Sequence, residues 1–219
     1  GGDIGPLADT FFERFVEHAT RPVLNLESNQ AHPLQGLADM ATLVERLKEP
    51  RGVKYVLTWA WHPKSLPVAT PHSQLVAACD LGMDVTLLRP EGFDLEPEVL
   101  RSARERARAG GGELRVTDDI DAAHDGARVV CAKAWSGVAW RGRYDDEARA
   151  KVPLRERWIV DEARLARGAD PFFMHCLPIR RNVVATGADL DSAASAVVDE
   201  AENRVWTAAA AIAAVLGAV

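Results

Sequence analysis

Six short apolar runs, each four to six residues long, recur along the chain and are rich in Val and other strand-forming residues. Most are continuous rather than alternating, which is typical of strands that are buried on both faces of a parallel sheet. The runs predict strands at residues 23–26, 55–60, 85–88, 114–117, 129–132 and 172–176.

Between these runs, apolar residues recur at helical spacing. Pro71 and Ser73 predict the start of one helix and Gly82 its end, while the glycines at 110–112 end another. The segments with helical spacing are residues 34–47, 73–81, 97–109 and 200–216. This alternation of strands and helices predicts an α/β fold, with a mostly parallel sheet and helices on both faces.

The residues that follow the predicted strands are unusually polar and aromatic. They are residues 27–29, 61–64, 89–91, 133–135, 175–178 and 180–182. Because ligands of open parallel sheets bind beyond the carboxyl ends of the strands, these segments predict a site for a small, charged metabolite.

Composition excludes several classes of function. The 219 residues are 47% hydrophobic and 26% charged, which is ordinary for a folded protein of one large domain or two small ones. The 26 Lys and Arg are outnumbered by 32 Asp and Glu, so the chain has no net positive charge to attract nucleic acid or an anionic membrane. The last apolar stretch, residues 206–219, is shorter than the roughly 20 residues that a membrane helix needs, and predicts a packed terminal helix.

Cysteine usage indicates a reducing environment. The three cysteines, Cys79, Cys131 and Cys176, are widely spaced and form no C-x-x-C pair, so neither a disulfide framework nor a zinc knuckle is indicated. With no export signal at the start of the sequence, we expect a cytoplasmic protein.

His32-Pro33-Leu34-Gln35 marks the predicted entry into the helix at residues 34–47. There the side chains of His32 and Gln35, with free backbone N–H groups, can face an anion or a carbonyl group. The tetrapeptide is equally consistent with an ordinary helix start that has Pro in its first turn.

His175-Cys176-Leu177-Pro178 follows the last predicted strand. Pro178 forces a turn, which leaves nearby backbone carbonyls free to accept hydrogen bonds from an NH2 group. A cysteine nucleophile is the weaker interpretation, because adjacent residues of a strand point to opposite faces. Arg180 and Arg181 are either cations for a carboxylate or phosphate, or solvated surface residues.

No metal or organic cofactor is predicted. The six histidines lack metal-ligand spacing, and the dinucleotide, P-loop and serine-hydrolase fingerprints are missing.

Five segments in order along the chain resemble the aspartate/ornithine carbamoyltransferase superfamily, and within it the branch that acts on N-acetylornithine or N-succinylornithine. They are H-P-L-Q-G-L-A-D at 32–39, Y-V-L-T-W-A-W-H-P-K at 55–64, A-K-A-W at 132–135, F-M-H-C-L-P-I-R-R-N at 173–182 and D-E-A-E-N-R at 199–204. The H-C-L-P-x-R-R-N form is more specific than H-P-x-Q, which ornithine enzymes share. The resemblance implies an enzyme that makes N-acylcitrulline and phosphate in arginine biosynthesis.

The resemblance also implies roles for individual residues. His32, Gln35, Leu177 and Arg204, with Cys176, are expected to contact carbamoyl phosphate, and His32 and Arg204 to act in catalysis. Glu27, Lys133 and Arg180 are expected to bind the acylated ornithine. Catalysis is then mainly orientation and charge stabilisation, with no covalent enzyme intermediate and with the phosphate as the expected proton acceptor.

Three departures from the family pattern shape these expectations. The phosphate-binding Ser-x-Arg-Thr-Arg type segment of the family's first domain is absent, so we expect a C-terminal portion that binds carbamoyl phosphate poorly by itself. Some acetylornithine enzymes have a modified lysine shortly after R-R-N, whereas this chain continues Val183-Val184-Ala185. Residues 66–71 and 26–28 are more similar to the succinylornithine branch, so the acyl group stays open.

The expected organisation follows the family. Residues 1–36 are interpreted as the end of the carbamoyl-phosphate domain, with a last helix near 11–16 and a strand at 23–26. Residues 37–195 form the amino-acid-binding domain, and 196–219 a helix that returns to the first domain. A homotrimer is implied by the resemblance. The alternatives are ornithine carbamoyltransferase and a non-catalytic amino-acid-binding domain; a truncated enzyme predicts exposed apolar surface on residues 208–219.

Overall fold

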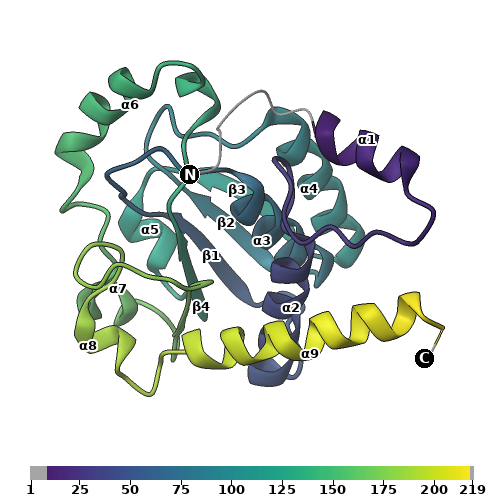
Figure 1. Cartoon of the computed structure of the whole chain (residues 1–219). Coiled ribbons are helices and arrows are strands. Elements are labelled where there is room, and N and C mark those ends of the chain that lie inside the picture. The colour runs from purple at the N-terminus through teal and green to yellow at the C-terminus, as the bar shows by residue number, and fades with distance from the viewer. Residues whose placement is uncertain (1–8, 218–219) are drawn as a thin grey trace.

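The computed structural model describes residues 9–217 and contains one five-stranded parallel sheet (Figure 1). The strands lie in the order β3-β2-β1-β4-β5. Their bounds are Lys54–Trp59 (β1), Asp84–Leu88 (β2), Glu113–Thr117 (β3), Val129–Lys133 (β4) and Phe172–Met174 (β5). The α/β fold that the sequence predicts is therefore confirmed.

Helices cover both faces of the sheet. From β1 the chain moves outward through α3 (Ala69–Asp80) to β2 and through α4 (Pro97–Gly110) to β3. It then reverses direction through α5 (Ile120–His124) to β4, and reaches β5 through α6 (Tyr144–Lys151) and α7 (Glu162–Leu165). Because parallel crossovers are right-handed, this reversal puts the second set of helices on the opposite face from α3 and α4.

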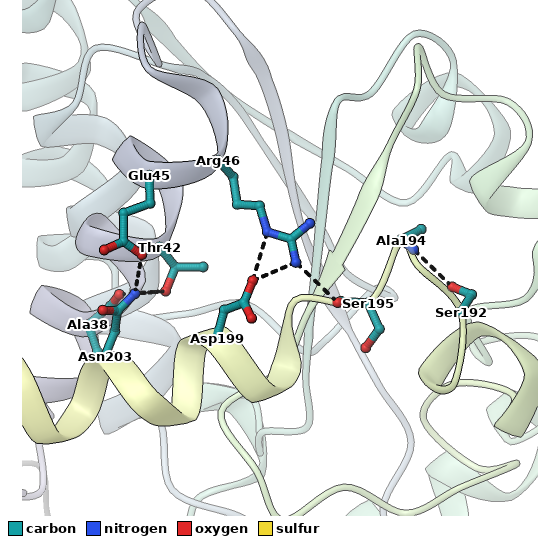
Figure 2. Close-up of polar contacts among 9 residues, drawn as sticks. All are labelled: Ala38, Thr42, Glu45, Arg46, Ser192, Ala194, Ser195, Asp199 and Asn203. Carbon is teal, nitrogen blue, oxygen red and sulfur yellow. Dashed lines mark hydrogen bonds and ion pairs between the residues drawn. The ribbon is translucent and has the colours of Figure 1, made fainter.

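Two long helices that are distant in the sequence pack side by side, α2 (Pro33–Leu47) and α9 (Val197–Val215). Figure 2 shows the polar contacts between them: Asn203 Nδ2 donates to Thr42 Oγ1 at 3.0 Å and to Glu45 Oε2 at 2.8 Å. One turn earlier on α9, Asp199 pairs with Arg46. These contacts fix the position of α9 relative to α2.

Buried tryptophans connect the carboxyl ends of the central strands. The Trp59 indole donates to the Trp135 carbonyl at 2.9 Å, and the Trp135 indole donates to the Phe93 carbonyl at 2.8 Å. Because all three side chains are buried, the segments that follow β1, β2 and β4 are held together at this edge of the sheet.

The structure corrects several local predictions. Residues 23–26 form no strand, and Leu26 is 61% exposed, because the described residues place no strand beside this segment to pair with its backbone. The helix predicted to begin at Ser73 begins at Ala69, since Pro71 lies in its first turn, where no backbone N–H is needed. The remaining elements are α1 (Thr10–His18), α8 (Gly187–Leu190) and the 3-10 turns η1 (Val138–Trp140) and η2 (Val152–Leu154).

The packing predicted for the terminal helix at residues 206–219 is wrong for its described part, in which only Thr207 is buried; the exposed apolar surface that a truncated enzyme predicts for residues 208–219 is found instead, and it extends back to Trp206. Trp206 is 63% exposed, Ile212 50% and Leu216 76%. Residues 1–8 and 218–219 of the two terminal segments lie outside the described residues. Among residues 9–217, no helix is long and apolar enough to cross a membrane.

Candidate functional site

A cavity of about 360 Å³ opens at the carboxyl edge of the sheet, next to the end of β4. Strand order reverses between β1 and β4, and such a switch point is where open α/β sheets bind ligands. The lining residues come from the segment before α2, from α2, α3 and α9, and from the ends of β4 and β5; they are Glu27, His32, Gln35, Thr70, Lys133, Cys176, Leu177, Glu200, Ala201 and Arg204.

His32 is positioned by contacts between α2 and α3. It is the N-cap residue of α2, and its backbone N–H donates to Ser73 Oγ at 2.8 Å. The helices approach closely at Gly36, where an added Cβ would lie 3.1 Å from the Ser73 carbonyl oxygen. His72 Nδ1 contacts the Gln30 carbonyl at 3.0 Å, which fixes the chain just before His32.

His32 is a neutral imidazole with a defined tautomer. Burial lowers its pKa below 6.5, and the nearby Arg204 guanidinium lowers it further. Arg204 Nη1 lies 3.4 Å from His32 Nδ1, and because a guanidinium can only donate, Nδ1 must be the acceptor. Nε2–H is therefore the donor that His32 can offer to a ligand.

Arg204 and Gln35 connect the cavity to two buried acids. Arg204 Nη1 donates to Gln35 Oε1 at 3.3 Å, and Gln35 Nε2 donates to Asp39 Oδ1 at 2.7 Å and to Glu200 Oε1 at 2.9 Å. Asp39 of α2 and Glu200 of α9 thus hold Gln35, which in turn holds Arg204 beside His32.

The opposite wall comes from the ends of β4 and β5. Lys133 ends β4, and its ammonium group contacts the Cys176 thiol. Burial nevertheless raises the pKa of Cys176 to about 12, so the sulfur is a protonated thiol at neutral pH and a poor nucleophile. The Leu177–Pro178 peptide bond is cis, and no donor among residues 9–217 hydrogen-bonds the backbone carbonyls of Cys176 or Leu177. These carbonyls are free to accept from a ligand.

The cavity therefore combines donors, cations and acceptors within one small volume. Arg204, Lys133 and neutral His32 can interact with an anion or a polarised carbonyl oxygen, while backbone carbonyls and Glu27 can accept from N–H groups. Such a set suits a ligand with an anionic group, a carbonyl and an NH2 group.

The structure brings all the predicted site residues to this cavity except one. Arg180 is exposed and is not among the lining residues. Arg181 is also on the surface, where it forms a bidentate pair with Asp191 at 2.6 and 2.8 Å.

Sequence reasoning missed Thr70, Ala201 and Glu200 in the lining and Asp39 behind it. Because α3 begins at Ala69 rather than at Ser73, Thr70 lies in its first turn and lines the cavity. Asp199 and Glu200 both lie in the first turn of α9, where an acid favours the helix dipole, but the sequence does not indicate that Glu200 is completely buried.

Comparison with known proteins finds relatives that share this sequence and fold. Residues 67–215 match the model of the family described as aspartate/ornithine carbamoyltransferase, Asp/Orn binding domain. The N-acetylornithine carbamoyltransferase of Xanthomonas campestris is 41% identical over 215 residues, which cover 95% of this chain and 62% of that protein. The N-succinylornithine carbamoyltransferase of Bacteroides thetaiotaomicron is 34% identical over 197 residues, covering 90% of this chain and 56% of that protein.

A solved structure agrees with the sequence relatives. The crystal structure of acetylornithine transcarbamylase complexed with acetylcitrulline is similar at a TM-score of 0.91 and 40% identity, over 94% of this chain and 62% of that one. This chain thus spans less than two thirds of the length of these relatives. The chain belongs to the aspartate/ornithine carbamoyltransferase family.

Proposed function

We propose that the protein containing this chain transfers the carbamoyl group of carbamoyl phosphate to the δ-amine of N-acetyl-L-ornithine or N-succinyl-L-ornithine. The products are the N-acylcitrulline and phosphate, as a step of arginine biosynthesis. The observation that carries the proposal is the convergence of His32, Gln35, Arg204 and Leu177 on one cavity at the switch point of the sheet.

The chemistry needs orientation and charge stabilisation more than a nucleophile on the protein. The lone pair of the uncharged δ-nitrogen forms a bond to the carbamoyl carbon, the bond from that carbon to the phosphate oxygen breaks, and the amine proton passes to the departing phosphate. Negative charge develops on the carbamoyl oxygen on the way. His32 Nε2–H and the Arg204 guanidinium supply donors for that oxygen, and the Leu177 carbonyl accepts from the carbamoyl NH2.

The amino-acid substrate is proposed to bind Glu27, Lys133 and Arg180. Lys133 and Glu27 line the same cavity as the carbamoyl site, so they suit groups close to the reacting amine. Arg180, on the surface beyond β5, suits a more distant carboxylate or acyl oxygen.

The proposal includes the arrangement of the whole protein. Residues 1–36 are proposed to end a carbamoyl-phosphate domain, residues 37–195 to bind the amino acid, and residues 196–219 to return to the first domain, in a cytoplasmic homotrimer. The exposed apolar side of α9 supports such a return, since a packed domain would cover Trp206 and Ile212. A sedimentation mass three times that of one complete chain is the expected result.

The test is formation of ureido product by the complete gene product. It is supplied with carbamoyl phosphate and, in separate reactions, ornithine, N-acetylornithine and N-succinylornithine. Turnover of one acylated amine with ornithine inert supports the proposal and identifies the acyl group, whereas turnover of ornithine supports an ornithine carbamoyltransferase.

A matched pair of arginine variants ties activity to the cavity. We expect Arg204→Gln to lower kcat by about 100- to 1,000-fold, the usual cost of losing a donor to a developing oxyanion. Arg181→Gln changes a surface arginine outside the cavity and is expected to retain activity. Absence of ureido product from all three amines would leave only a non-catalytic binding domain.

A further inference from the structure

Two buried carboxyl groups lie at the back of the cavity, Glu200 in its lining and Asp39 directly behind it. Asp39 on α2 is 1% exposed and Glu200 on α9 is 0% exposed. Neither forms an ion pair with any residue of the described part of the chain. Because burying an isolated carboxylate is costly, such a pair needs a physical explanation.

The contacts of the two acids favour a protonated pair. Each uses one oxygen to accept from Gln35 Nε2, and the other oxygens, Asp39 Oδ2 and Glu200 Oε2, have no hydrogen bond of good geometry in the described residues, although Gln74 and the backbone N–H of His175 lie beside the pair. Because both acids contact the same Gln35 nitrogen, the two carboxyl groups face each other at short range. Since two ionised carboxylates can only accept, one of them must carry a proton.

The surroundings favour retention of that proton. Burial raises the pKa of Asp39 to about 6, and burial together with the neighbouring Asp39 raises the pKa of Glu200 well above 4.5. Arg204 and Lys133 oppose this effect from the cavity side. The other groups that face the pair are Gln74 on α3, Tyr55 on β1, Cys131 on β4 and the backbone N–H of His175. None of these is charged at neutral pH, so nothing among them replaces the proton that the pair retains.

We propose that Asp39 and Glu200 share one proton and act as positioning residues that fix the orientation of the Gln35 amide, so that its Oε1 faces the cavity as an acceptor for an NH2 group. The identity of that NH2 group as the carbamoyl amide rests on the proposed function.

The orientation of Gln35 follows from its partners. Both hydrogens of Nε2 are donated to the acids, at 2.7 and 2.9 Å, while Oε1 accepts from Arg204. A flipped amide would place Oε1 against the Asp39 carboxylate oxygen and direct its N–H groups at the Arg204 guanidinium. Two acceptors would then face each other, and so would two donors. The acid pair therefore selects one of the two otherwise similar amide orientations.

The pair is not needed to join α2 to α9, because other residues do so. Asn203 bonds Thr42 and Glu45, and Arg46 bonds Asp199, on a part of the helix interface away from the cavity lining (Figure 2). Asp199 is thus a matched control: it is adjacent to Glu200 and links the same two helices without contacting Gln35.

The experiment compares two ligands that differ at the relevant group. Carbamoyl phosphate has an NH2 group where acetyl phosphate has a methyl group, so the ratio of their dissociation constants reports an acceptor aimed at the NH2. The ratio is measured by calorimetry on the complete gene product and on its Asp39→Ala, Asp39→Asn and Asp199→Ala variants. Asp39 does not line the cavity, so it influences the ratio indirectly, and the Asp39→Asn variant separates its hydrogen bond to Gln35 from its charge.

We expect Asp39→Ala to lower the preference for carbamoyl phosphate about tenfold, the factor that one hydrogen bond contributes. Asp39→Asn is expected to restore it, because the Asn oxygen accepts from Gln35 while its NH2 donates to an ionised Glu200. Asp199→Ala is expected to keep the wild-type ratio. An unchanged ratio in Asp39→Ala, or an equal loss in Asp39→Asn, would overturn the inference.

Two further results separate this inference from the proposed function. If the wild-type protein prefers carbamoyl phosphate over acetyl phosphate but forms no ureido product, only the proposed function is overturned. If it binds the two phosphates equally well, the positioning role of Asp39 and Glu200 is overturned. Should Asp39→Ala not fold, infrared spectroscopy decides: the wild type is expected to show a protonated-carboxyl band at neutral pH that Glu200→Gln removes. Absence of that band in the wild type would contradict the shared proton.

Discussion

Replacing Lys151 by Met is expected to destabilise the fold by about 3–5 kcal/mol, because it breaks an ion pair inside the molecule. Lys151 is 2% exposed and Glu147 0% exposed, and Lys151 Nζ lies 3.0 Å from Glu147 Oε1. Glu147 also accepts from Ser65 and from Ser136, the latter at 2.8 Å. In the variant these hydroxyls remain but the cation is lost, so the carboxylate stays buried without a counter-charge.

Urea unfolding of the wild type and of Lys151→Met measures this difference. Arg149→Met on the same helix is the control: its partner Asp146 and its own side chain are largely exposed, so we expect a change within about 0.5 kcal/mol. The double variant Glu147→Leu with Lys151→Met is expected to recover most of the lost stability, since an apolar pair has no charge to desolvate. A loss below about 1 kcal/mol in Lys151→Met, or a double variant no more stable than the single one, would show that the buried ion pair does not stabilise the fold in this way.

Two further predictions concern acid stability and backbone packing. Burial lowers the pKa of His175 to about 3, so between pH 6.5 and about 3 the unfolded state binds more protons than the folded state at this residue. Its contribution to stability is therefore lost as the pH falls through that window, and urea unfolding of His175→Gln should show a weaker pH dependence there; an unchanged dependence would contradict the buried neutral imidazole. Gly137→Ala would place a Cβ 2.3 Å from the Gly92 carbonyl oxygen and 2.5 Å from Phe93 Cα, so we expect a loss of at least about 2 kcal/mol in thermal or urea unfolding. Wild-type stability in this variant would show that the two loops can separate without cost.

The strands were predictable because they are buried on both faces. Residues such as Val56, Leu57 and Val130 are 0–1% exposed, and burial of this kind requires continuous apolar runs that the sequence displays directly. The run at 23–26 has a similar composition but has no strand beside it among the described residues, so composition alone predicts it wrongly. The helices α5, α7 and α8 have only four or five residues, too few for a periodic pattern to be detected.

Within the candidate site, residues that reach the cavity from the carboxyl ends of strands or the loops after them were predictable from position and family motifs. Lys133, at the end of β4, and Leu177, after β5, are examples. Glu200 was not, because an acid in the first turn of a helix is usually a solvated residue that favours the dipole. Only the packing of α9 against α2, a contact between segments about 165 positions apart, turns it into a buried partner of Gln35.

We propose above that this cavity is one wall of a carbamoyl-transfer site for an acylated ornithine. The most direct test is the rate of ureido product formation by the complete gene product from carbamoyl phosphate and each of ornithine, N-acetylornithine and N-succinylornithine. We predict turnover of one acylated amine, inert ornithine, and loss of that turnover in Arg204→Gln but not in Arg181→Gln. No product from any amine, or full activity of Arg204→Gln, would contradict the claim.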